Sequence, residues 1–317
     1  MEIPDAIQHA ARLLKGGGLV AFPTETVYGL GADATNATAV ARVFEAKERP
    51  HFDPLIIHLA SADWLPRYVE SIPLAAQDLA SHFWPGPLTL VLPKKSLIPD
   101  IVTAGLSTVA VRVPSHPIAC ALIESAGVPV AAPSANRFGR ISPTTAAAVH
   151  AELGDRMDFI LDGGPTEHGI ESAVVAFEDG IRILRPGPIT REELEDCIGR
   201  EVKVGAASAS RSESPQSPGQ LARHYSPRTP LRLVAGSEDV AAARGNRVGL
   251  LAFRKSTEGF IATEVLSAGG DLREAAANLF AALRRLDDAG LDLIIAESVP
   301  EHGLGMAIMD RLRKAAG

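Results

Sequence analysis

Short apolar runs alternate with amphipathic stretches along the first two thirds of the chain. Residues 1–18 have apolar side chains at the spacing of an amphipathic helix, which the three glycines at its end terminate. Leu19 to Phe22 then form an apolar run of strand length, which Pro23 closes because proline cannot continue a central ladder. We therefore expect the chain to leave a sheet at Pro23, with the polar residues after it at a strand end.

The same alternation predicts further elements up to residue 198. Helices are expected at about 37–48, at 62–83 with a break near Pro73, at 116–126, from 143 and at 190–197. Strands are expected at about 55–59, 88–92, 108–113, 128–132, 157–161, 170–175 and 181–186. Gly29 and Gly31 are expected to allow a tight backbone, and Ser142 is expected to cap the helix that Pro143 starts.

The pattern changes after Gly199. Serine, proline and glycine dominate residues 199–230, with serines at 208, 210, 212, 214 and 217, and this composition is typical of a linker. Beyond it, apolar runs at 231–234, 248–253 and 291–296 have strand length, and helical patterns occupy 272–287 and 304–314. The sequence thus predicts a first domain at 1–198, a linker at 199–230 and a small Rossmann-like α/β accessory domain at 231–317.

Composition narrows the class of protein. With 46% hydrophobic and 22% charged residues the chain resembles soluble globular proteins, and no apolar run approaches the ~18 residues of a membrane span. The N-terminus does not have the pattern of a signal peptide, and Cys120 and Cys197 form no C-x-x-C pair, so we expect a cytoplasmic location. The net charge of −7 argues against a broad nucleic-acid surface but permits a local basic cavity.

The stretch from Pro23 to His58 carries more polar chemistry than packing requires. Its polar side chains are Thr24, Thr26, Tyr28, Lys47, Arg49 and His58. Lys47 and Arg49 would lie at the end of the helix that Pro50 stops, where two cations could also simply complement the helix dipole. We interpret the stretch as the floor of a nucleotide and amino-acid site.

Two later strands also present polar side chains, each with two interpretations. Arg112 lies within the strand pattern at 108–113, where it either faces solvent from an edge strand or has a functional role. Ser134 and Asn136 follow the apolar run at 128–132, and they either form a turn or contact a ligand. The residues alone leave both questions open.

A dinucleotide-binding motif is the main rival interpretation of the glycines. Residues 29–34 (GLGADA) fit the loose G-x-G-x-x-G/A pattern. That motif needs its glycines directly after a strand, whereas five residues separate Pro23 from Gly29. No acidic residue closes the second strand in the expected place, so we disfavour an NAD site.

Several separated motifs, in order, resemble the YrdC-like family. They are PTETVYGLG from Pro23, the K-x-R-P turn at 47–50, PLIIH at 54–58, AVRVPSHP at 110–117, APSAN at 132–136, SP at 142–143 and ILRPG at 183–187. Together they span nearly all of residues 10–195. The resemblance implies an α/β fold with a YrdC-like twisted mixed sheet and a large concave cavity. It also implies a longer form of the family, in which the linker folds back over the active site as a lid.

The resemblance implies an activity as well. Members of the family join L-threonine, bicarbonate and ATP into L-threonylcarbamoyl-AMP and release pyrophosphate, for threonylcarbamoyladenosine formation in tRNA. The chain would then be a nucleotidyltransferase that supplies a downstream tRNA threonylcarbamoyl transferase machinery, with Mg²⁺ on the ATP phosphates and no metal ligand assigned to the protein. The sequence agrees with this, since it has no P-loop, no G-x-S-x-G elbow and no H-E-x-x-H.

Carried over motif by motif, the resemblance assigns two sets of residues. It implies threonine contacts for Thr24, His58, Arg112, Ala132 and Ser172. It implies ATP contacts for Lys47, Arg49, His51, Thr108, Ser134, Asn136, Ser142, Arg185 and Tyr225. Lys47 and Arg49 are also expected to act in catalysis. Two positions depart from the family, because Ala173 replaces a more usual Thr and Asp53 replaces a usual Asn, which leaves the role of Asp53 open.

An RNA-binding module is the alternative of a different class. YrdC-like domains have a basic concave face that can hold double-stranded RNA, so weak RNA binding is compatible with the resemblance. An RNA cradle needs Lys and Arg. It has no use for the ordered set of Thr24, His58, Arg112 and Ser172, which suits an amino acid. The synthase interpretation is therefore preferred.

Overall fold

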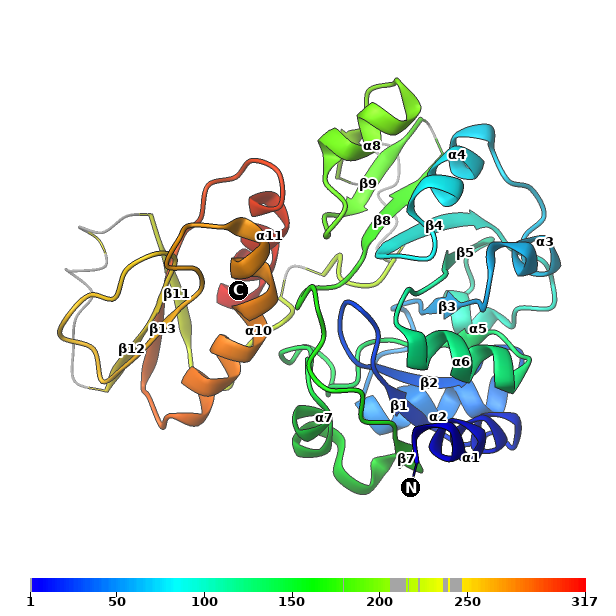
Figure 1. Cartoon of the computed structure of the whole chain (residues 1–317), viewed down its shortest axis with the longest axis horizontal. Helices are drawn as coiled ribbons and strands as arrows, with labels where there is room; N and C mark the ends of the chain where they lie inside the picture. Colours follow the sequence, from blue (N-terminus) through cyan, green and yellow to red (C-terminus); the bar gives the residue numbers. More distant parts are fainter. Residues whose placement is uncertain are drawn as a thin grey trace.

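The computed structural model describes residues 2–178, 180–205, 215, 217–221, 223–235, 239 and 247–317. Figure 1 shows two units side by side, the larger containing the N-terminus and the smaller containing the C-terminus. No helix in the described ranges is long and apolar enough to cross a membrane. The predicted linker serines at 208, 210, 212 and 214 lie outside the described residues.

The larger unit combines a sheet with helices and short 3₁₀ turns. Its helices are α1 (Ile3–Lys15), α2 (Ala37–Lys47), α3 (Leu65–Tyr68), α4 (Leu74–Phe83), α5 (Asp100–Thr103), α6 (Pro117–Ala126), α7 (Ala146–Leu153) and α8 (Arg191–Ile198). Its strands are β1 (Val20–Phe22), β2 (Gly29–Asp33), β3 (Ile56–His58), β4 (Leu88–Pro93), β5 (Thr108–Arg112), β6 (Val130–Ala131), β7 (Phe159–Ile160), β8 (Ala173–Ala176), β9 (Arg182–Arg185) and β10 (Lys203–Val204). The 3₁₀ turns are η1 (Ala62–Trp64) and η2 (Gly154–Arg156).

The strands of the larger unit form one mixed sheet. Their order is β10-β9-β8-β4-β5-β3-β6-β2-β1-β7. The parallel pairs β1/β7, β3/β5, β4/β8 and β9/β10 lie among antiparallel ones, which confirms the expected mixed α/β architecture. In the parallel pair β3/β5, His58 lies beside Arg112. The register of the sheet therefore brings together two residues that are far apart in the sequence.

The chain leaves the sheet at Pro23, as expected, but the expected tight backbone at Gly29 and Gly31 is wrong. These residues belong to β2, which pairs antiparallel with β1. A side chain at Gly31 would lie 2.7 Å from both Phe22 and Val130. The glycine is needed for close packing inside the sheet. A strand rich in glycine lacks the alternation of apolar and polar side chains by which strands are predicted from sequence.

The expected cap at Ser142 is also wrong. Helix α7 begins at Ala146, and the hydroxyl of Thr145 caps it by accepting a hydrogen bond from the backbone N–H of Ala148 (3.2 Å). Ser142 lies before this turn and donates its hydroxyl hydrogen to Glu171. Ser142 therefore binds a buried carboxylate from a distant segment, and it does not cap the helix as the local sequence pattern had predicted.

Two other helices are capped by the side chain that precedes their first turn. The side chain of Asn36 accepts hydrogen bonds from the N–H groups of Thr38 and Ala39 at the start of α2. Thr190 forms a capping box with Glu193 at the start of α8. Both caps satisfy N–H groups that the first helical turn leaves unpaired, which fixes where each helix starts.

The smaller unit is a parallel α/β domain. Its strands are β11 (Leu231–Val234), β12 (Val248–Ala252), β13 (Ala262–Val265) and β14 (Leu293–Glu297), and its long helices are α10 (Leu272–Asp288) and α11 (Gly305–Ala316). The order β11-β14-β12-β13 and the parallel pairing confirm the expected small parallel sheet. The sequence did not predict β13, because this edge strand is only half-buried and has no apolar face.

Helices α10 and α11 lie between the small sheet and the larger unit (Figure 1). Val27, Ile141 and Ile170 of the larger unit belong to the same apolar cluster as the core of the smaller one. A side chain at Gly169 would lie 2.4 Å from a backbone carbonyl of Ala277 in α10. The two units therefore pack closely at this interface.

We expect Gly31→Ala to lower the free energy of unfolding by about 1–3 kcal/mol, since its methyl group overlaps Phe22 and Val130 in the packed sheet. Urea denaturation measures this change. Gly269→Ala is the matched control, because a side chain there meets nothing within 4 Å. Equal stability of both variants would contradict the packing role of Gly31.

Candidate active site

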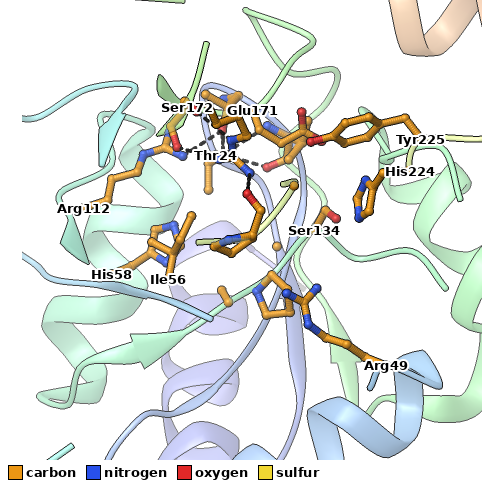
Figure 2. Close-up of a pocket in the computed structure, with 18 residues that line it drawn as sticks. Thr24, Arg49, Ile56, His58, Arg112, Ser134, Glu171, Ser172, His224 and Tyr225 are labelled. Carbon is orange, nitrogen blue, oxygen red and sulfur yellow. Dashed lines mark hydrogen bonds between the residues drawn. The ribbon is translucent and has the colours of Figure 1, made fainter. Parts of the chain in front are cut away.

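One cavity collects most of the polar residues that the sequence singled out (Figure 2). Its walls come from the ends of β1, β3, β5, β6 and β9, from the loop before β8, and from the segment at 218–225. The polar side chains that line it are Thr24, Thr26, Arg49, His58, Arg112, Ser134, Glu171, Ser172, Arg185, His224 and Tyr225. Figure 2 shows Arg112 and His58 on one side of the space and Arg49, His224 and Tyr225 on the other.

Arg112 is held in place by buried partners. It lies on an inner strand and is 3% exposed, so the edge-strand interpretation is wrong. Its Nε donates to the carbonyl of Gly86 (3.2 Å), its Nη1 donates to Thr26 Oγ1 (2.9 Å), and its Nη2 lies 2.7 Å from Glu25 Oε1. Burial raises the pKa of the Glu25 carboxyl, but the charge and hydrogen bond of Arg112 outweigh this and lower it overall. A rigid, charge-compensated guanidinium therefore faces the cavity.

His58 is a neutral imidazole next to that guanidinium. Burial first, and then the charge of Arg112, lowers its pKa to about 3. Its Nδ1 is buried and has no hydrogen-bond partner among the described residues. The side chain thus offers the cavity a polar group without a charge.

Ser172 lies between the two sides of the site. Its hydroxyl is 2.8 Å from that of Thr89 and accepts a hydrogen bond from Arg185 Nη2 (3.1 Å). Arg185 also donates from Nε to the carbonyl of Ser172 (3.1 Å). The last residue of β9 therefore fixes the residue that precedes β8.

Arg49 carries the positive charge on the opposite side. It donates from Nε to the carbonyl of Asp53 (3.1 Å) and from Nη2 to the carbonyl of Pro54 (2.8 Å), and Nη2 lies 2.8 Å from Asp53 Oδ2. The sequence left Asp53 without a role. In the structure its buried carboxylate compensates Arg49, while burial raises the pKa of that carboxyl more than the neighbouring cations lower it.

Lys47 stands behind the cavity wall rather than in it. Its ammonium donates to the backbone carbonyls of Ser134 (2.6 Å) and Asn136. Burial first, and then the charge of Arg49, lowers its pKa well below the ordinary value. The amide of Asn136 in turn donates to the carbonyls of Arg137 (2.7 Å) and Arg140 (2.9 Å). Both residues therefore shape the loop that presents Ser134.

Tyr225 closes the cavity from the linker. It is buried, adopts the left-handed backbone region with φ 60°, and has a hydroxyl without a hydrogen-bond partner in the described chain. Its ring centroid lies 4.2 Å from that of His224 and 5.5 Å from that of Phe280. The space that the lining residues enclose is about 40 Å³, whereas ligand pockets usually measure about 300–1,000 Å³. Pro218, Gly219, His224 and Tyr225 thus line a site that has little free space.

Besides Lys47 and Asn136, three further residues assigned from the resemblance do not line this cavity. His51 is exposed and packs against Phe44 with ring centroids 4.8 Å apart. Thr108 pairs with Pro93 at the opposite end of β5 from Arg112. Ser142 is buried and bonded to Glu171. The cavity does bring together Thr24, His58, Arg112, Ala132, Ser172, Arg49, Ser134, Arg185 and Tyr225.

Sequence reasoning missed two carboxylates at the site, Glu25 and Glu171. Glu25 lies inside the PTETVYGLG motif next to Thr24, and Glu171 precedes Ser172 within the predicted strand at 170–175. An acidic residue inside a buried strand is itself a signal, because a carboxylate is rarely buried without a cation. The sequence could therefore have indicated a buried ion pair at Glu171, but neither its partner nor the burial of Glu25.

We expect the free energy of unfolding to fall as the pH drops from about 7.5 to about 5, in part because of His58. An unfolded histidine titrates near pH ~6.5, so a folded pKa of about 3 gives stability that is complete above that pH and is lost below it. The loss from His58 at pH ~5 amounts to about 2 kcal/mol.

Urea unfolding of the wild type and of His58→Gln at both pH values measures this contribution. The variant should lose about 2 kcal/mol less than the wild type on acidification. His302→Gln, at an exposed position, serves as the control and should behave like the wild type. An unchanged pH dependence in His58→Gln would contradict the burial of a neutral imidazole.

Comparison with known proteins covers nearly the whole chain. A Sua5/YciO/YrdC family model, described as telomere recombination, matches residues 12–187, and the C-terminal domain of threonylcarbamoyl-AMP synthase matches 189–317. The threonylcarbamoyl-AMP synthase of Pyrococcus abyssi (strain GE5 / Orsay) is 45% identical, with 98% of this chain and 94% of the relative covered. That of Bacillus subtilis (strain 168) is 46% identical, with 98% and 93% covered.

A solved structure agrees with this similarity. P. abyssi Sua5 in complex with L-threonine superposes with a TM-score of 0.91 at 44% sequence identity, covering 98% of this chain and 94% of that chain. The mixed sheet and the second α/β domain are therefore those of the Sua5 proteins. The family matches and the full-length relatives together show that this chain belongs to the Sua5/YciO/YrdC family, in the form that carries a Sua5 C-terminal domain.

Proposed function

We propose that the protein synthesises L-threonylcarbamoyl-AMP from L-threonine, bicarbonate and ATP and releases pyrophosphate. The observation that carries the proposal is a single cavity with the Arg112 and His58 pair on one side and Arg49 and Tyr225 on the other. Such a cavity suits two ligands, an amino acid and a nucleotide. The names of the full-length relatives and the threonine complex of P. abyssi Sua5 support the same activity.

We propose that the threonine subsite is formed by Thr24, His58, Arg112, Ala132 and Ser172. Each Nη group of Arg112 has a second N–H, so its planar fork can bind the threonine carboxylate while it keeps its protein partners. The neutral His58 suits the threonine hydroxyl, because it can hydrogen-bond without adding charge. Thr24 is itself held, since its hydroxyl donates to the carbonyl of Val27 (2.7 Å).

The proposed nucleotide subsite lies on the opposite side. Arg49 and Arg185 supply positive charge, and Ser134 supplies a hydroxyl. Tyr225 supplies a ring and a hydroxyl that has no hydrogen-bond partner among the described residues. Lys47, His51, Thr108, Asn136 and Ser142 remain proposed ATP contacts. For Lys47 and Asn136 the contacts support an additional role, because both shape the Ser134 loop. We also propose that Lys47 and Arg49 stabilise charge in the transition state.

The reaction fits a site without a protein nucleophile. The threonine amine and bicarbonate form a carbamate with loss of water, and a carbamate oxygen then attacks the α-phosphorus of ATP. The bond from the α-phosphorus to the bridging oxygen of the β-phosphate breaks, and pyrophosphate leaves. This nucleotidyl transfer needs orientation and charge compensation more than covalent catalysis, which a rigid set of buried cations can provide.

Mg²⁺ on the ATP phosphates is expected from the chemistry of phosphoryl transfer. The part of the chain that the structure describes has no group of three His, Cys, Asp or Glu side chains that could hold a metal. Glu25 and Asp53 near the cavity are paired with Arg112 and Arg49. These residues do not form a protein cage for the ion, so its ligands would come from ATP.

We propose that the segment at 218–225 is a lid. A space of about 40 Å³ cannot admit either substrate, so this segment has to move during each turnover. A downstream tRNA threonylcarbamoyl transferase machinery would consume the product once the lid opens. We place the reaction in the cytoplasm. Weak RNA binding remains the competing proposal.

A pyrophosphate-release assay tests the proposed function. We expect release with ATP, bicarbonate and L-threonine together, and little when either threonine or bicarbonate is omitted. Mass spectrometry should identify the threonylcarbamoyl adenylate. RNA binding in the absence of threonine-dependent pyrophosphate release would reject the synthase and favour the RNA module.

We expect Arg112→Lys to raise the KM for threonine by about ten-fold or more and to leave the KM for ATP little changed, because an ammonium cannot reproduce the guanidinium fork. Steady-state kinetics with each substrate varied in turn measure this difference. Arg42→Lys, at a surface position, is the control. Equal losses for both substrates would mean that Arg112 has a structural role only.

A further inference from the structure

Among the described residues of the accessory domain, Arg311 has the most deeply buried charged side chain. It pairs with its neighbour Asp310 (3.0 Å), but its other hydrogen-bond partners lie outside that domain. It projects from α11, has 0% exposure, and donates from Nε to Glu171 Oε2 (3.0 Å). It also donates from Nη2 to the carbonyl of Glu171 (3.3 Å) and from Nη1 to the carbonyl of Pro186 (2.7 Å). The guanidinium thus binds both segments of the larger unit that flank Ser172 and Arg185.

Glu171 connects this guanidinium to the cavity. It lines the cavity beside Ser172, and its second carboxylate oxygen accepts the hydroxyl hydrogen of Ser142. Burial raises the pKa of Glu171, but the charges of Arg311 and Arg185 outweigh it and lower the pKa overall. Glu171 is therefore an ionised carboxylate whose orientation Arg311 fixes from behind.

The same helix also holds the lid. The guanidinium of Arg311 stacks over the ring of Tyr225, with Cζ 5.3 Å from its centroid. Three residues further along α11, Lys314 donates from Nζ to the carbonyl of Gly219 (2.7 Å), and its own carbonyl accepts from the N–H of His224 (3.1 Å). One turn of α11 therefore contacts the lid at both ends of the segment that covers the cavity.

We propose that Arg311 is a positioning residue of the active site, which sets Glu171 and Ser172 on one wall and Tyr225 on the lid. This inference rests on the proposed function and assigns the accessory domain a direct part in it. A helix outside the cavity then determines the geometry of both substrate subsites. The contacts predict that Arg311 affects the affinity for threonine and for ATP together, unlike Arg112.

A simpler role would be to fasten the two domains. A buried ion pair of that kind changes stability when it is broken, but it leaves the affinity of the remaining folded protein unchanged. Arg284 provides the comparison, since it joins the same two domains. It lies in α10, pairs with Glu152 (2.8 Å) and donates to the carbonyl of Ile141 (2.9 Å), and it does not line the active-site cavity.

Arg311→Lys tests the two roles in the full-length protein. The lysine keeps the positive charge beside Glu171, but a single ammonium cannot also reach both carbonyls or stack on Tyr225. We expect the KM values for ATP and for threonine both to rise by about ten-fold. Arg284→Lys should leave both within about two-fold of the wild type. Melting temperatures of both variants check that the assayed protein is folded.

A double-variant comparison guards against misfolding. Arg311→Met leaves Glu171 buried without its cation, whereas Arg311→Met with Glu171→Gln removes both charges. If the two residues act as one unit, the affinity of the double variant for each substrate should be no more than about two-fold below that of the weaker-binding single variant. Independent, multiplying losses would contradict the proposal, as would wild-type KM values in a destabilised Arg311→Lys.

Failure of the proposed function and failure of the Arg311 inference give different experimental results. A wild-type protein without threonine-dependent pyrophosphate release contradicts the proposed function. Calorimetric dissociation constants for threonine and ATP then still test Arg311, because they need no turnover. An active wild type with unchanged dissociation constants in Arg311→Lys contradicts the inference alone.

Discussion

Buried positive charge is the constraint on which this structure depends. Arg49, Arg112, Arg185 and Arg311 lie inside the protein, and a buried guanidinium is tolerated only where carboxylates and carbonyl oxygens surround it. Satisfying these groups brings strand ends, the loop before β8 and helix α11 to one place. The first three arginines also line the cavity, so the contacts that stabilise the fold and those that shape the site are largely the same.

The strands and helices of the larger unit were mostly predictable from the sequence, because apolar periodicity and capping residues are local signals. Position 31 was not, since a glycine chosen for packing gives no periodic pattern. Ser142 was misassigned for a related reason. A serine before a proline has the pattern of a helix cap, and only the three-dimensional structure brings it to Glu171, a residue far along the chain.

The candidate site was also only partly predictable from the sequence. Motif order identified the polar residues that line the cavity, but not the acids that pair with its cations. Glu25 and Asp53 each pair with a guanidinium that also faces the space where a substrate anion would bind. In the proposed site, substrate carboxylate and phosphate groups would therefore meet cations that are already partly compensated. This arrangement keeps the arginines in position before binding, and it would limit how strongly an anionic product is retained.

The small volume under the proposed lid has a consequence for the lifetime of the product. A carbamoyl adenylate is a mixed anhydride, which water hydrolyses. The free space of about 40 Å³ is too small to hold it, so under this proposal the product forms in a wider site. A lid that moves would then expose the product to water as well as to its acceptor. The contacts of α11 with Gly219 and His224 would therefore influence how the product divides between delivery and spontaneous decay.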